Sequence, residues 1–381
     1  MSSIDTSAEI VSGLREISFE FRGNAKDYFG IWIVNLFLSI ITLGIYTAWA
    51  KVRRQRYFYG NTFLDNHNFE YHAKPKQILI GRIIVVVILI LYQVLVNLNP
   101  IFTALLIPYL IAFPWVLNKA LSFNARVTSY RNIHFNFKGS YWRAFVAFII
   151  MPIVAIFSLG LLAPFSSRMS QKYIGNNLKW GQGTFKTDVK LLTLYKLVGF
   201  CFLFLILASL VVTGLGYIVS VGVDLSPLGD LFAIVSGDLT EQKQNNSEVG
   251  FVFLSMIVFY TVLIYSFLVY SVGVRNIAYN ATKLITKTNS NEGESEVRSH
   301  QLSSSISRLK YIWILTSNLF AILCSLGLLR AWAAVRTWRY KTEKTALYVD
   351  GSLDNIVAMQ VAAGSATSAE FFDIEGIDLG L

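Results

Sequence analysis

A segment that occurs three times is the strongest constraint on how this chain folds. Thr42–Tyr57 joins an apolar run to a helix-compatible stretch rich in Arg and Trp. Ser325–Tyr340 matches it without a gap, 283 residues later. The first-copy residues with identical partners include Gly44, Ala48, Trp49, Ala50, Val52, Arg53, Arg56 and Tyr57. A fainter copy begins at Ser158, 116 residues after the first. We therefore predict one structural unit that is used three times.

Short segments that alternate apolar and polar residues flank the repeated stretch. Ile17–Gly23 precedes the first copy and Phe69–His72 follows it, and such alternation is typical of half-buried β-strands. The offset of 116 extends to the second unit, where it aligns Phe135 with Phe19, Phe137 with Phe21, Gly139 with Gly23 and Phe185 with Phe69. The third unit shows no convincing strands at its flanks. The pattern predicts short strands around at least two of the units.

The composition is that of a membrane protein. Of the 381 residues, 54% are hydrophobic and only 15% are charged, against about 25% charged in average chains. The mean hydropathy is +0.51, and 28 Phe, 19 Tyr and 8 Trp could occupy the membrane interfaces. We expect an all-α polytopic membrane protein with three internal repeats and short cytoplasmic β-strands flanking at least two of them.

The apolar runs and polar breaks divide the chain into segments. Between the units lie pairs of apolar segments long enough to span a hydrocarbon core of about 30 Å. The expected segments are a disordered N-terminus (1–16), repeat unit 1 (17–77), a transmembrane hairpin (78–118), repeat unit 2 (133–190), a transmembrane hairpin with an acidic external loop (191–273), a polar linker (286–304), repeat unit 3 (305–350) and an acidic C-terminal tail (351–381).

The distribution of charge suggests an orientation. A net charge of +10 would suit a nucleic-acid partner, but the chain has no nucleic-acid motif, and a positive-inside bias accounts for the excess. Residues 46–77 carry six basic side chains, whereas residues 224–248 carry five acids and Lys243. We expect a multi-pass protein of a bacterial cytoplasmic membrane, with both termini cytoplasmic. Its partners would be the bilayer and anionic lipid headgroups. The sequence leaves the oligomeric state open.

Three apolar runs conflict with this orientation. Segments 28–50, 141–163 and 311–331 each have basic residues on both sides, so full crossings would place basic loops outside. Either each unit enters and returns on the cytoplasmic face, as a helix followed by an interfacial basic helix, or the chain has seven conventional spans that obey the charge rule weakly.

Two groups of residues are candidates for a functional role. The first is a basic and aromatic belt for anionic lipid or a partner, which consists of Trp49, Arg53, Arg56, Tyr57, Trp332, Arg336, Arg339 and Tyr340. The simpler interpretation of this belt is an anchor whose long side chains reach the interface. The second group is polar and falls within apolar runs, namely Asn35, Asn318 and Gln93.

No pattern of catalytic chemistry is present in the sequence. Cys201 and Cys324 lie inside apolar runs without clustered His or Cys, so they do not predict a metal site. There is no nucleophile motif and no Gly-rich phosphate loop. We expect no enzymatic activity, no metal and no cofactor.

Several motifs together resemble the YjgN-like family of bacterial inner-membrane proteins. They are Phe19-x-Phe21-x-Gly23, Thr42–Ala50, Arg56-Tyr57, Asn61-Thr62, Tyr279–Thr282 and Phe371–Ile374. The resemblance implies a multi-pass cytoplasmic-membrane protein of uncharacterised function, and it supplies no catalytic residues. The second unit departs from the pattern, because Phe165 replaces Trp49.

Two functional hypotheses follow. The chain is either a passive conduit or transporter for a small solute, or a membrane scaffold that binds anionic lipid or a partner through its basic belts. The few polar residues within the apolar runs argue against a pump with buried carboxylates.

Overall fold

The computed structural model describes residues 14–220, 246–289, 295–354 and 356–358. The chain divides into two compact units, one formed by Met1–Lys190 with Asn276–Leu381 and the other by Leu191–Arg275. The second unit consists of the long helices α9 (Leu191–Ser220) and α11 (Asn246–Asn280), of which the last residues of α11 belong to the first unit.

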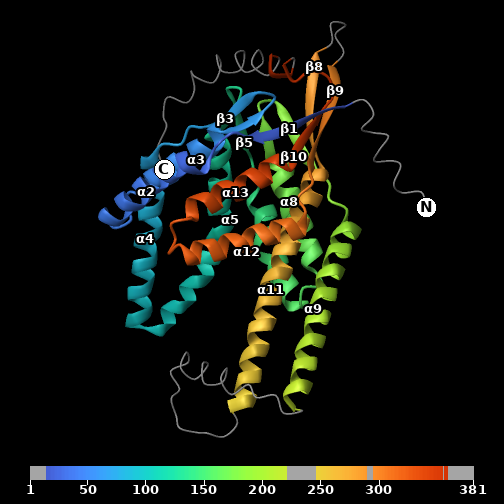
Figure 1. Ribbon diagram of the computed structural model, residues 1–381. Helices are drawn as coiled ribbons and strands as arrows, with labels where there is room; N and C mark the ends of the chain where they lie inside the picture. Colours follow the sequence, from blue (N-terminus) through green and yellow to red (C-terminus); the bar gives the residue numbers. More distant parts are fainter. Residues whose placement is uncertain (1–13, 221–245, 290–294, 355, 359–381) are drawn as a thin grey trace, which may run out of the picture. The chain divides into compact units, whose positions relative to one another are not determined.

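The first unit is built on a closed antiparallel barrel (Figure 1). Among the described residues its strands are β1 (Arg15–Phe21), β2 (Thr62–Leu64), β3 (His67–Tyr71), β4 (Thr128–Tyr130), β5 (Ile133–Phe137), β6 (Leu178–Trp180), β7 (Gly183–Thr187), β8 (Thr282–Asn289), β9 (Ser295–Ser304) and β10 (Thr345–Val349). Each strand pairs with its neighbours in sequence, and β10 closes the barrel against β1.

The barrel shows that the prediction of an all-α fold is wrong. Strands were expected as short additions around at least two units, but they come from all three units and from the connections between them and close into one barrel. The predicted linker 286–304 instead forms most of the β8–β9 hairpin. Its residues are mostly polar and lack the alternation of a half-buried strand, so the sequence resembled a linker. Residues 15 and 16, expected to be disordered, begin β1, while residues 1–13 lie outside the described residues.

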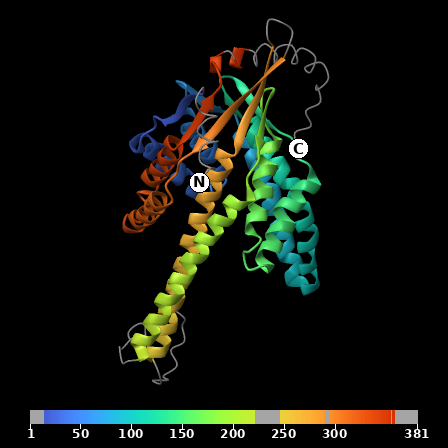
Figure 2. The same ribbon diagram turned by 90° about the vertical axis from the view of Figure 1, so that its right-hand side faces the viewer.

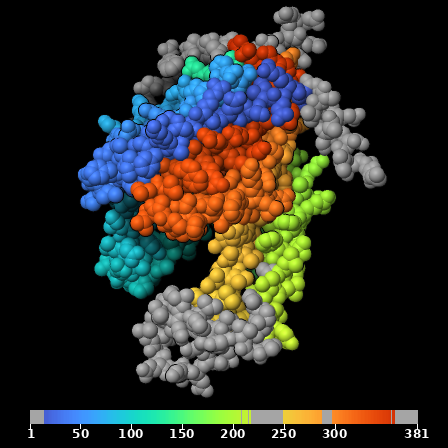
Figure 3. Space-filling view, viewed as in Figure 1, coloured from blue at the N-terminus to red at the C-terminus, as the bar shows by residue number. Residues whose placement is uncertain are grey.

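Helices connect β1 to β2, β3 to β4, β5 to β6, β7 to β8 and β9 to β10. In the first unit they are α2 (Ala25–Ile41), α3 (Thr47–Gly60), α4 (Pro75–Leu98), the 3-10 helix η1 (Pro100–Leu105), α5 (Leu106–Arg126), α6 (Tyr141–Phe145), the π-helix η2 (Val146–Ile150), α7 (Met151–Phe157), α8 (Ala163–Asn177), α12 (Arg308–Cys324) and α13 (Arg330–Glu343). Among these, α13 packs against both α12 and α2, and α2 packs against α3. Figure 3 shows α2 lying along α13.

Five helical excursions, each a helical segment that connects two consecutive strands, begin and end at one rim of the barrel. The strand that precedes each excursion ends beside the start of the strand that follows it, in register. The five register pairs at this rim are Phe21 with Thr62, Tyr71 with Thr128, Phe137 with Leu178, Thr187 with Thr282 and Ser304 with Thr345. The hairpin turns that the structure describes lie at the opposite rim. Two of them, Asp65-Asn66 and Arg131-Asn132, have positive φ at both residues, as tight antiparallel hairpins require.

Aromatic side chains fill the barrel. Phe19 stacks on Phe69, with ring centroids 5.9 Å apart, and Phe69 meets Tyr130 at 4.7 Å. Tyr130 lies 5.8 Å from Trp180, and its hydroxyl donates to the Leu64 carbonyl at 2.7 Å. These residues belong to one core, to which all ten strands contribute buried or partly buried apolar residues. The interior is therefore a packed core rather than a channel.

The chain after β10 covers part of this core. Leu353, Ile356 and Val357 are buried in the same cluster as the strand residues. His300 on β9 fixes the start of this segment, because its Nδ1 accepts from the Asp350 amide at 3.1 Å and its Nε2 lies 3.0 Å from Thr286 Oγ1. The tail expected at 351–381 therefore starts as a part of the fold, and residues 359–381 lie outside the described residues.

In each of the three repeat units, the same kind of turn joins the first helix to the second: α2 to α3, α7 to α8 and α12 to α13. The tips are Leu43-Gly44, Leu159-Gly160 and Leu326-Gly327, and both residues of every tip have positive φ. The hydroxyl of the residue before the tip accepts from the amide three residues after the Leu, as in Thr42 Oγ1 with the Tyr46 amide at 2.9 Å. Ser158 and Ser325 make the same bond at 3.0 Å.

Four helical segments among the described residues are long and apolar enough to cross a membrane. They are Pro75–Leu98, Pro100–Arg126, Leu191–Gly214 and Val249–Asn280. The helices of the three repeats are shorter, with 17 residues in each of α2 and α12. In Figures 1 and 2, α12 and α13 run across the direction of α4 and α5. The expected acidic loop lies almost wholly outside the described residues.

Replacement of Trp180 tests the aromatic core. Trp180→Ala should lower the free energy of unfolding by about 3–5 kcal/mol, because it leaves a large cavity. Trp180→Phe should cost less than half of that, since the indole Nε1 has no hydrogen-bond partner among the described residues. Thermal unfolding of the purified protein in detergent measures both, and equal losses would contradict the proposed packing role.

His300 should make the fold sensitive to mild acid. Burial lowers the pKa of His300 below its ordinary value of 6.5, with Arg298 acting in the same direction and Asp350 against it. Below about pH 6.5 the unfolded chain therefore binds a proton that the folded chain does not, and stability falls. The melting temperature should drop between about pH 7.5 and about pH 5.5, and less so in His300→Gln. An equal drop in both proteins would contradict this assignment.

Candidate functional site

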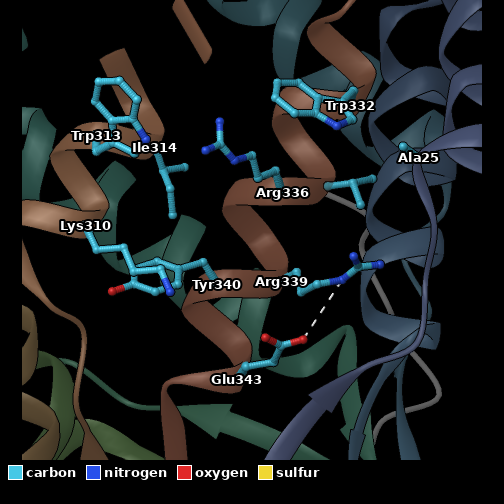
Figure 4. A pocket seen from close by; sticks show the side chains of 10 residues that line it. Ala25, Lys310, Trp313, Ile314, Trp332, Arg336, Arg339, Tyr340 and Glu343 are labelled. Carbon is cyan, nitrogen blue, oxygen red and sulfur yellow. Dashed lines mark ion pairs between the residues drawn. The ribbon is translucent and has the colours of Figure 1, made fainter. Parts of the chain in front are cut away.

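A pocket of about 470 Å³ lies between α12 and α13, next to the start of α2. Figure 4 shows Lys310, Trp313 and Ile314 on α12 facing side chains of α13. The lining residues are Ala25, Lys310, Trp313, Ile314, Trp332, Val335, Arg336, Arg339, Tyr340 and Glu343. Four of the eight residues of the predicted belt therefore lie at one site.

Arg336 is held in place at the centre of this pocket. Its Nη1 donates to Ser317 Oγ at 2.7 Å and to Asn318 Oδ1 at 3.0 Å. Its guanidinium carbon lies 5.1 Å from the centre of the Trp332 ring. Bonds to α12 and a cation–π contact on α13 therefore fix the orientation of the guanidinium.

Asn318 supports Arg336 and also joins the two helices. It is buried, and its amide donates to the Ala333 carbonyl at 3.2 Å and to Thr337 Oγ1 at 2.9 Å. Asn318 was predicted to be a polar residue within an apolar run, where it could line a path. In the structure, the side-chain amide and carbonyl of Asn318 instead form hydrogen bonds with residues of α13.

Arg339 and Tyr340 connect the pocket to the neighbouring backbone. Arg339 Nη2 donates to the Gly23 carbonyl at 2.7 Å, and Arg339 Nε lies 4.0 Å from a Glu343 carboxylate oxygen. The Tyr340 hydroxyl accepts from the Ser307 amide at 3.0 Å. Lys310 Nζ lies 5.5 Å from the centre of the Tyr340 ring.

The pocket favours an anion. Lys310, Arg336 and Arg339 bring three positive charges and Glu343 one negative charge, so the lining carries a net +2. Within the described residues, no carboxylate lies within 4.0 Å of the cationic groups of Lys310 or Arg336. Trp313 is 66% exposed beside these charges. The site therefore combines anion-binding groups with indole surface, which suits an anion that carries an apolar part.

The belt residues of the first unit are used differently. Arg53 Nη1 lies 3.4 Å from the Tyr46 hydroxyl, and Tyr46 stacks on Trp49 at 6.0 Å. Arg56 donates to the carbonyls of Tyr71 and Ala73 at 3.3 and 3.4 Å. The Tyr57 hydroxyl donates to the Asn24 carbonyl at 2.6 Å. The structure does not bring these side chains into the pocket of the third unit, and Arg56 and Tyr57 join elements of the fold.

The predicted intramembrane polar residues lie on three separate helices. Asn35 on α2 is buried, and its Oδ1 has no hydrogen-bond partner among the described residues. Gln93 on α4 donates to Asn97 Oδ1 at 3.2 Å within the same helix. Together with Asn318 they show three different environments rather than one shared site.

The comparison of repeated positions overlooked Lys310, Trp313 and Glu343. The offset of 283 aligns them with Asp27, Gly30 and Gly60, so the copies differ at all three. Shared positions identify the scaffold, whereas Lys310, Trp313 and Glu343 distinguish the third unit from the first. A search for differences between the copies would have pointed to them.

A candidate metal centre is absent from the part of the chain that the structure describes. No group of three or more His, Cys, Asp or Glu side chains is placed to hold a metal ion there.

Comparison with known proteins identifies the family. Residues 16–374 match the model of a family described as "Bacterial protein of unknown function (DUF898)". The chain belongs to this family. The inner membrane protein YjgN of Salmonella typhimurium is 36% identical over 141 residues, which are 36% of each chain. Its namesakes in Escherichia coli O157:H7 and K12 are 30% identical over 158 residues, 40% of this chain and 39% of theirs.

These matches confirm the YjgN-like resemblance. The aligned stretches cover well under half of the curated relatives, whose names place them in the inner membrane. No solved structure is a match for the chain.

Asn318 and Asn35 form a matched pair for a test of the site. Asn318→Ala removes three hydrogen bonds, one of them to a charged group, and should lower the free energy of unfolding by about 2–4 kcal/mol. Asn35→Ala occupies the equivalent position and should cost about 1 kcal/mol or less, because its Oδ1 makes no bond that the described residues show. Thermal unfolding in detergent compares the two, and equal losses would rule out the bracing role of Asn318.

Proposed function

We propose that this chain is a non-enzymatic membrane scaffold that binds anionic phospholipid headgroups in the pocket between α12 and α13. The observation that carries the proposal is the fixed guanidinium of Arg336, which stands with Lys310 and Arg339 beside exposed indole. A headgroup phosphate supplies the negative charge, and its glycerol and acyl portions supply the apolar part. Arg is suited to bidentate binding of phosphate oxygens.

The proposal places the pocket at a membrane surface. The apolar side chains Leu309, Phe320 and Leu323 of α12, the helix that forms one wall of the pocket, are exposed and would contact lipid. Each Lys or Arg near an anionic surface contributes roughly 1 kcal/mol of attraction. Three cations at the level of the headgroups would therefore retain anionic lipid against a neutral competitor.

The barrel topology supports a single orientation. Because every helical excursion returns beside the place it left, each one crosses a membrane an even number of times or not at all. We infer that α4 with α5, and α9 with α11, form two spanning hairpins. The barrel and both termini would then share the cytoplasmic side, in agreement with the basic loops.

The same topology supports the interpretation that the three units are copies of one structural motif. In each unit a strand, a helix, a Leu-Gly tip, a second helix and a strand follow one another. The conduit hypothesis has less support, because the barrel interior is packed with aromatic side chains and Asn318 bonds to α13.

Lipid selectivity tests the proposed function. The full chain in neutral detergent, titrated with phosphatidylglycerol or phosphatidylcholine in native mass spectrometry, should retain phosphatidylglycerol preferentially. Arg336→Gln should weaken that binding roughly fivefold, and adding Lys310→Gln should weaken it roughly fivefold again, at about 1 kcal/mol for each charge. Binding should also weaken from about 50 mM to about 500 mM salt.

Arg53→Gln is the matched control. It removes the same charge at the equivalent position of the first unit, where Arg53 faces Tyr46 and not the pocket. It should leave lipid binding close to that of the unmodified chain. Equal affinity for the two lipids, or equal losses in Arg53→Gln and Arg336→Gln, would refute a specific headgroup site.

A further inference from the structure

Leucine stands in an unfavourable conformation at the tip of each short helix pair. Leu43, Leu159 and Leu326 have φ of 49°, 52° and 50°. For a residue with a Cβ, the left-handed region costs roughly 1–2 kcal/mol, and only Gly, Asn and Asp visit it routinely. The same unfavourable backbone conformation therefore occurs at the equivalent leucine of all three repeat units.

Packing within the protein does not explain these leucines. Their exposed fractions are 94%, 86% and 95%, so their side chains contact almost nothing in the fold. The turn itself is closed by other groups. Gly44, Gly160 and Gly327 donate their amides to carbonyls of the preceding helix at 2.7, 2.8 and 2.7 Å, and the Ser or Thr hydroxyls cap the second helix.

The apolar surface continues from the tips along the helices. On α2, Phe37, Ile40 and Ile41 are exposed, whereas Tyr28 and Asn35 on the other face are buried. On α12, Leu309, Trp313, Phe320 and Leu323 form an exposed stripe at helical spacing, opposite buried Tyr311, Ile314 and Asn318. In α7, Ile156 and Phe157 are exposed next to Leu159.

These surfaces start at the barrel rim from which the spanning helix α4 also departs. In Figures 1 and 2, α12 runs across the direction of α4, so a membrane crossed by α4 would meet α12 inclined towards its plane. Short apolar helices in this position lie in one leaflet rather than across both.

We propose that the three short helix pairs, α2–α3, α6–α8 and α12–α13, are wedges in the barrel-side leaflet, with their tip leucines in its acyl layer. They add volume to one leaflet only. The chain should therefore prefer membranes in which the barrel-side leaflet is convex, and it should promote such curvature at high density. This function is separate from headgroup binding, since it depends on the tips and not on Arg336.

Spin labels measure the depth of the tips. In a background of Cys201→Ser and Cys324→Ser, single cysteines at positions 43, 159 and 326 are labelled after reconstitution in vesicles of phosphatidylethanolamine and phosphatidylglycerol. Their accessibility to oxygen and to an aqueous nickel reagent should place them in the acyl layer, shallower than a label at Leu89 within α4. A label at Lys179 on the barrel gives the aqueous reference. Tip labels that behave like the one at position 179 would overturn the proposal.

Substitution by Asn separates the membrane role from a structural one. The triple variant L43N, L159N and L326N relieves the left-handed strain, so its melting temperature in detergent should equal or exceed that of the unmodified chain. On nanotubes pulled from giant vesicles with the barrel outside, the unmodified chain should be enriched over the flat membrane. The Asn variant should lose this enrichment, while L43M, L159M and L326M keep it.

Enrichment of the Asn variant equal to that of the unmodified chain would overturn the proposal, and so would its loss in the Met variant. The Arg336→Gln chain should remain enriched on tubes, so failure of the lipid site and failure of the wedge are separate results.

Discussion

Closure of β1 against β10 is the interaction on which the rest of the structure depends. Residues Arg15–Ser18 pair in register with Ala346–Val349, so strands at opposite ends of the chain become neighbours. This closure sets α13 against α2, where Arg339 reaches the Gly23 carbonyl and Ala25 lines the pocket. An open sheet would leave the candidate site without its third wall.

The barrel carries the same kind of helix pair at three positions. Tyr57, Tyr173 and Tyr340 each donate a hydroxyl to a carbonyl just before the first helix of their pair, at 2.6, 3.1 and 3.4 Å. These bonds hold the second helix against the entry of the first. Because the helix pair is fixed by such shared residues, the remaining positions are free to differ, and Lys310 and Trp313 give the third copy its pocket.

The sequence predicted the helical parts of this fold better than its strands. The repeated stretch with Gly44, Trp49 and Arg53 was visible because the same residues recur at a fixed offset. The barrel was missed because seven of its strands have only three or five residues, and β8 and β9 are mostly polar. Closure is a pairing between distant strands, which no local pattern reports. Within the site, Trp332 and Arg336 were identified by recurrence, whereas Lys310, Trp313 and Glu343 depend on which helix faces which.

The basic residues on both sides of each short apolar run follow from the rim topology. A run that crossed the membrane once would carry its two flanks to opposite sides, but both flanks of each helix pair are tied to adjacent strands. Both flanks must then share a side, and the charge rule applies to them equally. On this argument the apparent violation of the rule is a consequence of barrel closure.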